Sequence, residues 1–405
     1  MIQKQLEKAF TAFRRAHVMN PVLAQFEQHV RTPEKKINVS FSHNGTMYNG
    51  FRIQYNTILG PAKGGIRAAS YVNEDECTSL AFWMTIKTAL FNLPLGGGKG
   101  GFNADMSAMS EADKEMICRK YVRAIHRDIG PNVDIPAPDV GTTSAMMDIM
   151  NDEYKKLSGC TSNGTFTGKT VANGGSLGRT EATGYGVSYM TSLYANQFIP
   201  KTDNNTYILQ GFGNVGSYTA IHMAKFLPSY KLVAVGDHTG YYHNPDGFNV
   251  AELFEYNAAN KSLKGITANT ISKTDFFKIP VDIIIPAALE CEIDETVAES
   301  INCKLIVEGA NGPCTPEADL VLQRKGIQII PDILANAGGV IVSYYEWVQN
   351  MENDMYSHER VIELLRDRMK PIYTAIYNDS TPIDKRTMCY VHSLGNIYRK
   401  YTDSL

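Results

Sequence analysis

Three lysines and one aspartate in the first 140 residues have types and settings that could carry chemistry. They are Lys63 in PAKGGIR, Lys87 in MTIKTAL, Lys99 in LPLGGGKGG and Asp139 in IPAPDVGT. Glycine- and proline-rich backbone turns sharply, so a long cationic side chain can project into a cleft. Two ammonium groups suit two carboxylates, while a lysine with an aspartate suits proton transfer. Beside a nucleotide-type glycine motif farther along the chain, this set indicates redox chemistry on a dicarboxylate.

Mutual repulsion would set the charge states of these lysines if they converge on one cavity. Two cations about 5 Å apart at an effective dielectric of about 20 repel by roughly 3 kcal/mol, which corresponds to about two pKa units. With burial added, the pKa of one lysine would approach neutrality. We expect it to be Lys99, because its flanking glycines give it no local charge partner. Asp139, behind a stiff Pro-Ala-Pro run, is expected to be the proton-shuttling acid/base.

Each of these residues also has a purely structural interpretation. A lysine in a glycine loop is usually a solvated surface charge, and an aspartate after proline often caps a turn or helix. Arg67 in KGGIR suits an ion-pair partner better than a substrate ligand. Ser343 in SYYEWVQN suits either a substrate contact or a plain helix position. The four residues together, beside a nucleotide motif, favour the functional interpretation.

The glycine motif GFGNVG is typical of a dinucleotide loop. Gly211, Gly213 and Gly216 follow the strand-like TYILQ and open a helix-like segment, where free backbone N–H groups favour a pyrophosphate. Asp237 ends the next apparent strand, near the spacing expected for an acceptor of the ribose hydroxyls. An acid there disfavours a 2′-phosphate, so NAD is favoured and NADP is the alternative, because His238 could donate to a phosphate. A strand–turn–helix that binds no ligand is the structural interpretation.

Composition bounds the class of protein. A chain of 405 residues with 43% hydrophobic and 20% charged residues is globular and long enough for two domains. A net charge of −3 provides no basic field for nucleic acid, and no apolar run is long enough for a membrane span. Seven scattered cysteines without a CxxC pair indicate a reducing, cytoplasmic compartment, and no metal-ligand cluster is apparent. The Arg14–Arg15 pair admits a transit peptide, although Glu7 and the amphipathic pattern favour a structural helix.

Hydrophobic periodicity predicts a two-part organisation. The first part contains helices over 1–35, 74–92 and 110–128 and a hairpin over 38–57, and it ends in a Gly/Ser/Thr-rich hinge over 160–180. The second contains a βαβ unit around GFGNVG and further strands, which predict a parallel, doubly wound sheet. These strands are expected over 281–288, 304–310 and 326–332, and helices are expected over 341–377 and 387–403.

Motifs in order along nearly the whole chain resemble the glutamate dehydrogenases of the glutamate/leucine/phenylalanine/valine dehydrogenase family. They are GPAKGGIR, MTIKTALFNLPLGGGKGG, DIPAPDVGT, TGKTVANGGSLGRTEATGYGV, GFGNVG, NPDGF, VEGANGPCTPEAD and PDILANAGGVIVSYYEW. The resemblance implies an α/β fold with three parts: an N-terminal substrate-binding and oligomerisation domain over 1–180, a Rossmann-like dinucleotide-binding domain over 181–380, and a C-terminal helix over 381–405 that returns to the first domain.

The resemblance also implies roles for the substrate residues. Lys63 and Ser343 would hold the side-chain carboxylate of glutamate, and Lys87 would hold its α-carboxylate. Lys99 would activate the water that attacks the imino carbon, and Asp139 would pass protons to and from the amino nitrogen. Two further residues, Ala137 and Val340, would shape the pocket.

For the coenzyme, the resemblance implies that Thr183 and Asn336 orient the nicotinamide. Further contacts are expected from the loop residues Gly211, Gly213, Asn214, Val215 and Gly216, and from Asp237 and Asn311.

The implied reaction is the reversible conversion of L-glutamate, water and NAD(P)⁺ into 2-oxoglutarate, ammonium and NAD(P)H by a homo-oligomer, most often a hexamer. Two rival interpretations stay open. One is a dehydrogenase of apolar amino acids, in which apolar residues are expected where Lys63 and Ser343 stand. The other is a nucleotide-binding regulator without catalysis, which intact Lys99 and Asp139 disfavour.

Overall fold

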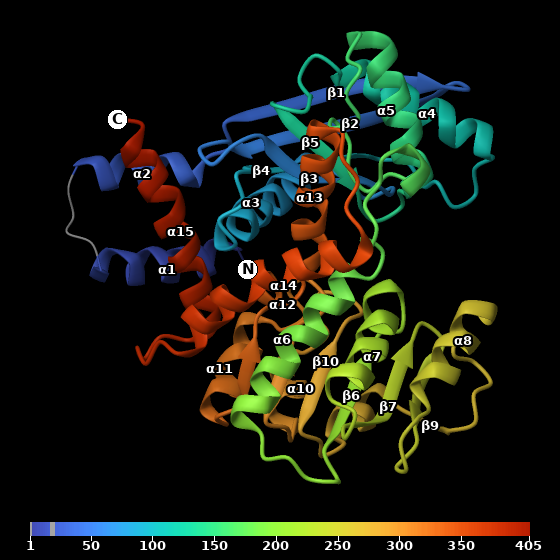
Figure 1. Cartoon of the computed structure of the whole chain (residues 1–405), viewed down its shortest axis with the longest axis vertical. Helices are drawn as coiled ribbons and strands as arrows, with labels where there is room; N and C mark the ends of the chain where they lie inside the picture. The colour runs from blue at the N-terminus through green and yellow to red at the C-terminus, as the bar shows by residue number, and fades with distance from the viewer. Residues whose placement is uncertain (1, 17–20) are drawn as a thin grey trace. The chain divides into compact units, whose positions relative to one another are not determined.

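The computed structural model describes residues 2–16 and 21–405, which form two compact units. The first unit consists of Ile2–Arg179, Val340–Leu364 and Thr387–Leu405, and the second of Thr180–Gly339 and Leu365–Arg386. Figure 1 shows the elements of both. No helix among the described residues is long and apolar enough to cross a membrane.

A five-stranded sheet of order β1-β2-β4-β3-β5 forms the centre of the first unit. Strands β1 and β2 form the predicted antiparallel hairpin, whose turn is the Asn44–Gly45 pair with φ of 48° and 79°. Strand β3 runs parallel to both of its neighbours. The strands are β1 (Lys35–His43), β2 (Thr46–Asn56), β3 (Ala62–Ala68), β4 (Gly97–Phe102) and β5 (Asp134–Pro138).

Three capped helices accompany this sheet, namely α3 (Glu74–Leu90), α4 (Glu111–Ile125) and α5 (Ser144–Ser158). The side chains of Asn73, Ser110 and Thr143 each accept a hydrogen bond from a first-turn N–H, so all three helices have a side-chain N-cap. The core on the α4–α5 side includes Phe41, Phe102 and Tyr121. The 3₁₀ turn Val171–Asn173 lies in the predicted hinge segment.

The predicted N-terminal helix is two helices, α1 (Ile2–Ala16) and α2 (Pro21–Arg31), and residues 1 and 17–20 of that prediction lie outside the described residues. Phe26 of α2 contacts the ring of Tyr398 on the C-terminal helix α15 (Lys385–Asp403). The predicted helix over 341–377 is also two helices, α13 (Gly338–Glu352) and α14 (His358–Tyr377), which are separated near Asn353 at a φ of 53°.

The second unit contains a seven-stranded sheet of order β12-β11-β10-β6-β7-β8-β9. Its β12 to β7 part is parallel and Rossmann-like, as predicted. Strands β8 and β9 add an antiparallel edge that the sequence reading missed, because each is only a few residues long. The strands are β6 (Thr206–Gln210), β7 (Lys231–Asp237), β8 (Gly240–His243), β9 (Asn269–Ile271), β10 (Ile283–Pro286), β11 (Leu305–Val307) and β12 (Gln328–Ile330).

Helices connect these strands and cover the sheet. They are α6 (Ala182–Phe198), α7 (Asn214–Phe226), α8 (Val250–Asn260), α9 (Lys273–Lys278), α10 (Glu295–Ser300), α11 (Pro316–Arg324) and α12 (Asp332–Ala335). Helices α6 and α7 pack closely, since a Cβ on Gly184 would lie 2.7 Å from Val215 O.

The two units divide the chain differently from the predicted domains. The boundary near residue 180 is similar, but Val340–Leu364 belongs to the first unit, although we expected it within 181–380. The reason is side-chain pairing, because Trp347 Nε1 donates to Pro131 O at 2.8 Å and Glu346 pairs with Lys169. The predicted C-terminal part over 381–405 is divided between the units, because its residues up to Arg386 belong to the second unit and Thr387–Leu405 belongs to the first.

Candidate active site

Lys63, Lys99 and Asp139 all come from the parallel part of the first sheet. Lys63 lies on β3, Lys99 on β4, and Asp139 directly follows β5. Strand β3 separates the other two strands. Residues far apart in sequence are therefore brought together by the order of the strands.

Lys99 and Asp139 form an ion pair between Nζ and Oδ2. The other carboxylate oxygen, Oδ1, accepts from Arg67 Nε at 2.9 Å and from the backbone N–H of Val140 at 2.8 Å. Burial alone would raise the pKa of Asp139, but the charges of Lys99 and Arg67 outweigh it and hold this pKa well below its usual range. Asp139 is therefore held as an ionised carboxylate.

The charge partner of Lys99 is distant in sequence. Its flanking glycines offer no local partner, as expected, and Asp139 reaches it from the end of β5. Arg67 is an ion-pair partner as predicted, since it also pairs with Glu76 of α3. A Cβ on Gly65 of β3 would lie only 2.8 Å from Asp139 Oδ2, so this glycine leaves the space that the carboxylate needs.

The lysine whose pKa approaches neutrality is Lys63. Its side chain is 1% exposed, and burial, together with the nearby charge of Arg52, lowers its pKa to about 7. Arg52 is itself fully buried, and its Nε donates to Asp134 Oδ2 at 2.8 Å. Its Nη1 donates to Gly64 O at 3.2 Å, so Arg52 also supports the backbone beside Lys63.

Ser343, on α13, is 2% exposed, and its hydroxyl lies 2.7 Å from the hydroxyl of Thr167. The backbone N–H of Thr167 donates to Pro136 O of β5 at 3.0 Å. Sequence reasoning did not single out Thr167, although it begins the TGKTVANGGSLGR motif. Only the pairing with α13 reveals it.

The remaining residues expected to contact the substrate lie on neighbouring elements of the first unit. Ala137 is buried on β5, and Val340 is half-buried near the start of α13. Lys87 is half-buried in the last turn of α3. This helix packs directly on the strand of Lys99, because a Cβ on Gly97 would lie 2.0 Å from Thr85 Oγ1.

A cavity of about 790 Å³ lies beside the glycine loop of the second unit. Gly211 has a φ of 91°, and a Cβ on Gly216 would lie 1.8 Å from Gly211 O, so the tight turn into α7 needs both glycines. A Cβ on Gly213 would meet no protein atom within 4 Å. Helix α7 begins at Asn214 without a side-chain cap, which leaves its N–H groups for a ligand. These features fit a dinucleotide pyrophosphate.

Asp237 lines this cavity, but its carboxylate is largely used by the chain itself. It accepts from Thr239 N at 2.7 Å, from Thr239 Oγ1 at 2.5 Å and from Leu263 N at 2.6 Å, and its side chain is 5% exposed. A ribose hydroxyl would share these oxygens with Thr239 and Leu263. The neighbouring His238 is 72% exposed.

The other expected coenzyme residues also lie in the second unit. Asn336 Nδ2 donates to Asn311 Oδ1 at 3.0 Å. Thr183 lies in the first turn of α6, and Asn214 Nδ2 donates to Thr180 O at 2.9 Å, so the start of α6 lies beside the glycine loop. Val215 lies in the first turn of α7.

One group of described residues has the donor types of a metal site, namely Glu308, Cys314 and Asp319. Arg386 lies among them, with Nη2 2.7 Å from Glu308 Oε1 and Nε 2.8 Å from Asp319 Oδ2. A guanidinium therefore supplies the positive charge of this group.

Comparison with known proteins identifies the family of the chain. Residues 174–403 match the model of the Glutamate/Leucine/Phenylalanine/Valine dehydrogenase family, and residues 33–156 match its dimerisation domain. The glutamate dehydrogenase of Thermotoga maritima is 40% identical over 98% of this chain and 97% of its own. The NAD-specific glutamate dehydrogenase of Clostridioides difficile is 42% identical over 86% and 85%.

Solved structures give the same result for the fold. The hetero-hexameric glutamate dehydrogenase of Thermus thermophilus superposes with a TM-score of 0.90 at 29% identity, covering 98% of this chain and 94% of its own. The enzyme of Peptoniphilus asaccharolyticus gives 0.85 at 35% identity, covering 100% and 99%. With both family models matched and relatives aligned end to end, the chain belongs to the glutamate/leucine/phenylalanine/valine dehydrogenase family.

Proposed function

We propose that this chain is an NAD-dependent glutamate dehydrogenase, which converts L-glutamate and water reversibly into 2-oxoglutarate and ammonium. The observation that carries the proposal is the Lys99–Asp139 ion pair, in the same unit as the buried Lys63 and the Ser343–Thr167 hydroxyl pair. A carboxylate held ionised beside an ammonium suits proton transfer at an amino group. The names of the relatives in T. maritima and C. difficile support the substrate.

The residues of the first unit divide the work on the substrate. Lys63 and the hydroxyl of Ser343 bind the side-chain carboxylate, and Lys87 binds the α-carboxylate. Ala137 and Val340 bound the aliphatic part of the substrate. Because a bound carboxylate favours the charged form of Lys63, the substrate restores the proton that burial removes.

Asp139 and Lys99 move protons at the reacting carbon. Asp139 accepts a proton from the substrate ammonium, so the amine can donate electrons as the Cα hydrogen leaves. Lys99 then orients the water that adds to the iminium carbon, and the proton that this water loses passes to solvent. Asp139 returns its proton to the departing nitrogen. Arg67 and the Val140 N–H hold the carboxylate in place during these steps.

In the second unit, the loop of Gly211, Gly213 and Gly216 would hold the dinucleotide, with Asn214 and Val215 at the start of α7. NAD held there would supply the hydride acceptor for Cα. Asn336, Asn311 and Thr183 would orient the nicotinamide, and Asp237 would order the loop beside the ribose. NAD is favoured over NADP because an acid lines the cavity and because the C. difficile relative is NAD-specific.

Assembly and compartment complete the proposal. The matched dimerisation domain and the hetero-hexameric Thermus relative support assembly into a hexamer, which we propose is built from copies of this one chain. All seven cysteines are free thiols, which supports a reducing, cytoplasmic environment.

Two assays test the proposal. Purified protein with L-glutamate should reduce NAD⁺ much faster than NADP⁺, measured by the absorbance of the reduced nicotinamide. Replacing Lys63 by Leu and Ser343 by Val together should shift preference from glutamate toward L-norvaline, which lacks the side-chain carboxylate. Unchanged glutamate turnover in this double variant would refute the pocket assignment, and no turnover by the unaltered protein would favour a non-catalytic nucleotide binder.

A further inference from the structure

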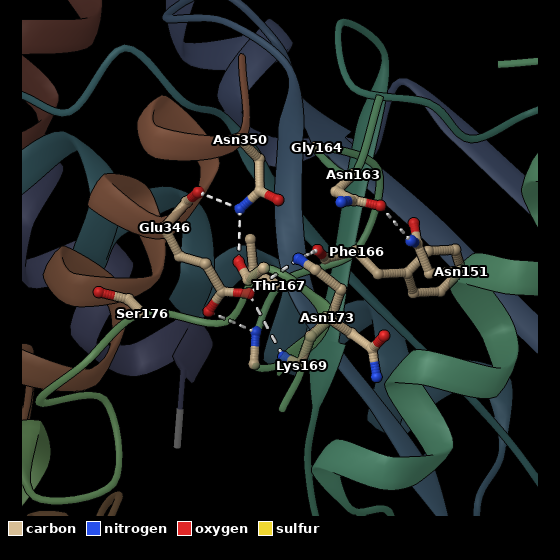
Figure 2. Close-up of polar contacts among 12 residues, drawn as sticks. Asn151, Asn163, Gly164, Phe166, Thr167, Lys169, Asn173, Ser176, Glu346 and Asn350 are labelled. Carbon is tan, nitrogen blue, oxygen red and sulfur yellow. Dashed lines mark hydrogen bonds and ion pairs between the residues drawn. The ribbon is translucent and has the colours of Figure 1, made fainter. Parts of the chain in front are cut away.

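The turn Phe166–Lys169 is fastened to helix α13 by a buried ion pair. Lys169 Nζ lies 2.9 Å from Glu346 Oε1, and both side chains are 0% exposed. The ammonium also donates to Phe166 O. The carboxylate accepts from the backbone N–H groups of Gly168 at 2.8 Å and of Lys169 at 3.3 Å. Figure 2 shows Glu346 pointing from its helix into this turn.

The same turn and helix carry the two hydroxyls of the proposed carboxylate pocket. Thr167 immediately precedes the Gly168 N–H that donates to Glu346, and Ser343 lies one helical turn before Glu346 on α13. The 2.7 Å contact between the two hydroxyls therefore depends on how the turn sits on the helix.

The turn also contacts the strand that leads to Asp139. Gly168 has a φ of 73°, and a Cβ there would lie 2.4 Å from Pro138 Cδ. A displacement of the turn would therefore move Thr167 against β5 as well as against Ser343. Charge-assisted hydrogen bonds between buried groups have a narrow range of geometry, which suits them to fix such a position.

We propose that the Lys169–Glu346 pair is a positioning device that sets the discrimination of this enzyme for an acidic substrate side chain, by holding Thr167 against Ser343. The pair does not touch the substrate and acts through these two hydroxyls. This inference rests on the proposed function, since it assumes that glutamate is the substrate. The negative charge of Glu346 also opposes the lowering of the Lys63 pKa. Removing that charge would lower the protonated fraction of Lys63 and so would also reduce the preference for an acidic side chain.

The test compares L-glutamate with L-norvaline in single and double variants. Glu346→Gln and Lys169→Met each remove one partner, and we expect kcat/KM for glutamate to fall by about tenfold or more, mainly through KM. For norvaline we expect a change within about twofold, because its side chain makes no charged contact. The double variant should lose no more than either single variant, because the two residues act as a unit.

Asn350→Ala is the matched control. Asn350 lies one turn beyond Glu346 on α13, and its Nδ2 donates to Gly174 O at 2.7 Å. The same Nδ2 donates to the backbone O of Glu346 at 2.6 Å. The substitution therefore removes two contacts of the helix backbone and the neighbouring segment but leaves both side chains of the ion pair in place. Its preference for glutamate over norvaline should equal that of the unaltered protein.

Equal losses for both substrates in the single variants would overturn the inference, as would an altered preference in Asn350→Ala. If a single variant does not fold, the double variant decides, because replacing both members of a buried pair leaves no isolated charge. A double variant that is folded and keeps the original preference also overturns the inference. Failure of the proposed function is a separate outcome, visible as an unaltered protein that does not prefer glutamate.

Discussion

Lys99 and Asp139 meet across Gly65 of the strand that separates them. Lys99 lies on β4, Asp139 follows β5, and β3 runs between. The pair can form because Gly65 has no side chain, since even a Cβ would lie 2.8 Å from the Asp139 carboxylate. One absent methyl group thus permits the proposed proton-transfer pair.

Gly65→Ala tests this relationship. The added methyl must displace the Asp139 carboxylate, and a misplacement of about 1 Å can cost roughly 100-fold in kcat. We expect a loss of that size in steady-state kinetics with glutamate. Gly395→Ala is the control, because its Cβ would make only an ordinary contact of 3.9 Å with Phe13. Normal activity of Gly65→Ala would show that the pair tolerates displacement or is not needed.

The lowered pKa of Lys63 predicts a pH dependence of substrate binding. Burial disfavours the ammonium, so the protonated fraction falls as the pH rises above about 7. Because the substrate carboxylate needs that charge, kcat/KM for glutamate should fall above this pH, approaching tenfold per pH unit. Binding of 2-oxoglutarate should also take up a proton, measurable by calorimetry in buffers of different ionisation enthalpy. A flat profile and no proton uptake between about pH 7 and pH 9 would contradict this.

Two substitutions in the glycine loop should have different effects, one on coenzyme binding and the other on thermal stability. Gly213→Ala meets no protein atom, so it should leave thermal unfolding unchanged and raise KM for NAD⁺ by about tenfold. Gly216→Ala would clash with Gly211 O at 1.8 Å and should lower the unfolding temperature. A lower unfolding temperature in Gly213→Ala, or an unchanged KM for NAD⁺, would contradict the proposal that the dinucleotide binds next to Gly213.

Arg386 predicts a stability change unrelated to catalysis. Its guanidinium compensates the buried carboxylates of Glu308 and Asp332 and the half-buried Asp319. Arg386→Met should destabilise the protein by about 3–5 kcal/mol in urea unfolding at neutral pH, because it leaves buried charges unpaired. The exposed Arg324–Glu299 pair provides the control, since Arg324→Met should cost less than about 1 kcal/mol.

The loss in Arg386→Met should shrink in acid. Burial raises the pKa of Glu308 above its ordinary 4.5 even with Arg386 present. A raised native pKa means that Glu308 binds a proton more readily in the folded protein than in the unfolded chain. The contribution of this protonation to the free energy of unfolding is complete below about pH 4.5 and is lost as the pH rises. A destabilisation that is constant from neutral pH to acid would indicate lost packing instead of unpaired charge.

Local sequence was enough to predict the parts of the site that depend on local backbone. The glycines of the dinucleotide loop and the Asn44–Gly45 turn of the predicted hairpin impose their conformations on their immediate neighbours. Lys63, Lys99 and Asp139 could be selected because glycine and proline surround them. Periodicity likewise indicated the parallel strands of the second unit.

Pairings between distant residues could not be predicted in this way. The partner of Lys99 depends on the order of β4, β3 and β5, which no local pattern specifies. Thr167 and Ser343 are 176 positions apart and meet only because α13 belongs to the first unit. The pKa of Lys63 depends on Arg52 and on burial, which exist only in the folded chain.

The interleaving of the two units has a consequence for synthesis. Ser343 and its neighbours on α13 emerge from the ribosome only after the whole of Thr180–Gly339, and Thr387–Leu405 emerges later still. The hydroxyl of Ser393 donates to Ile86 O at 2.9 Å, so the helix that carries Lys87 receives one of its buried contacts from this late segment. A nascent chain that stops before it can thus finish its glycine loop but not the proposed substrate pocket.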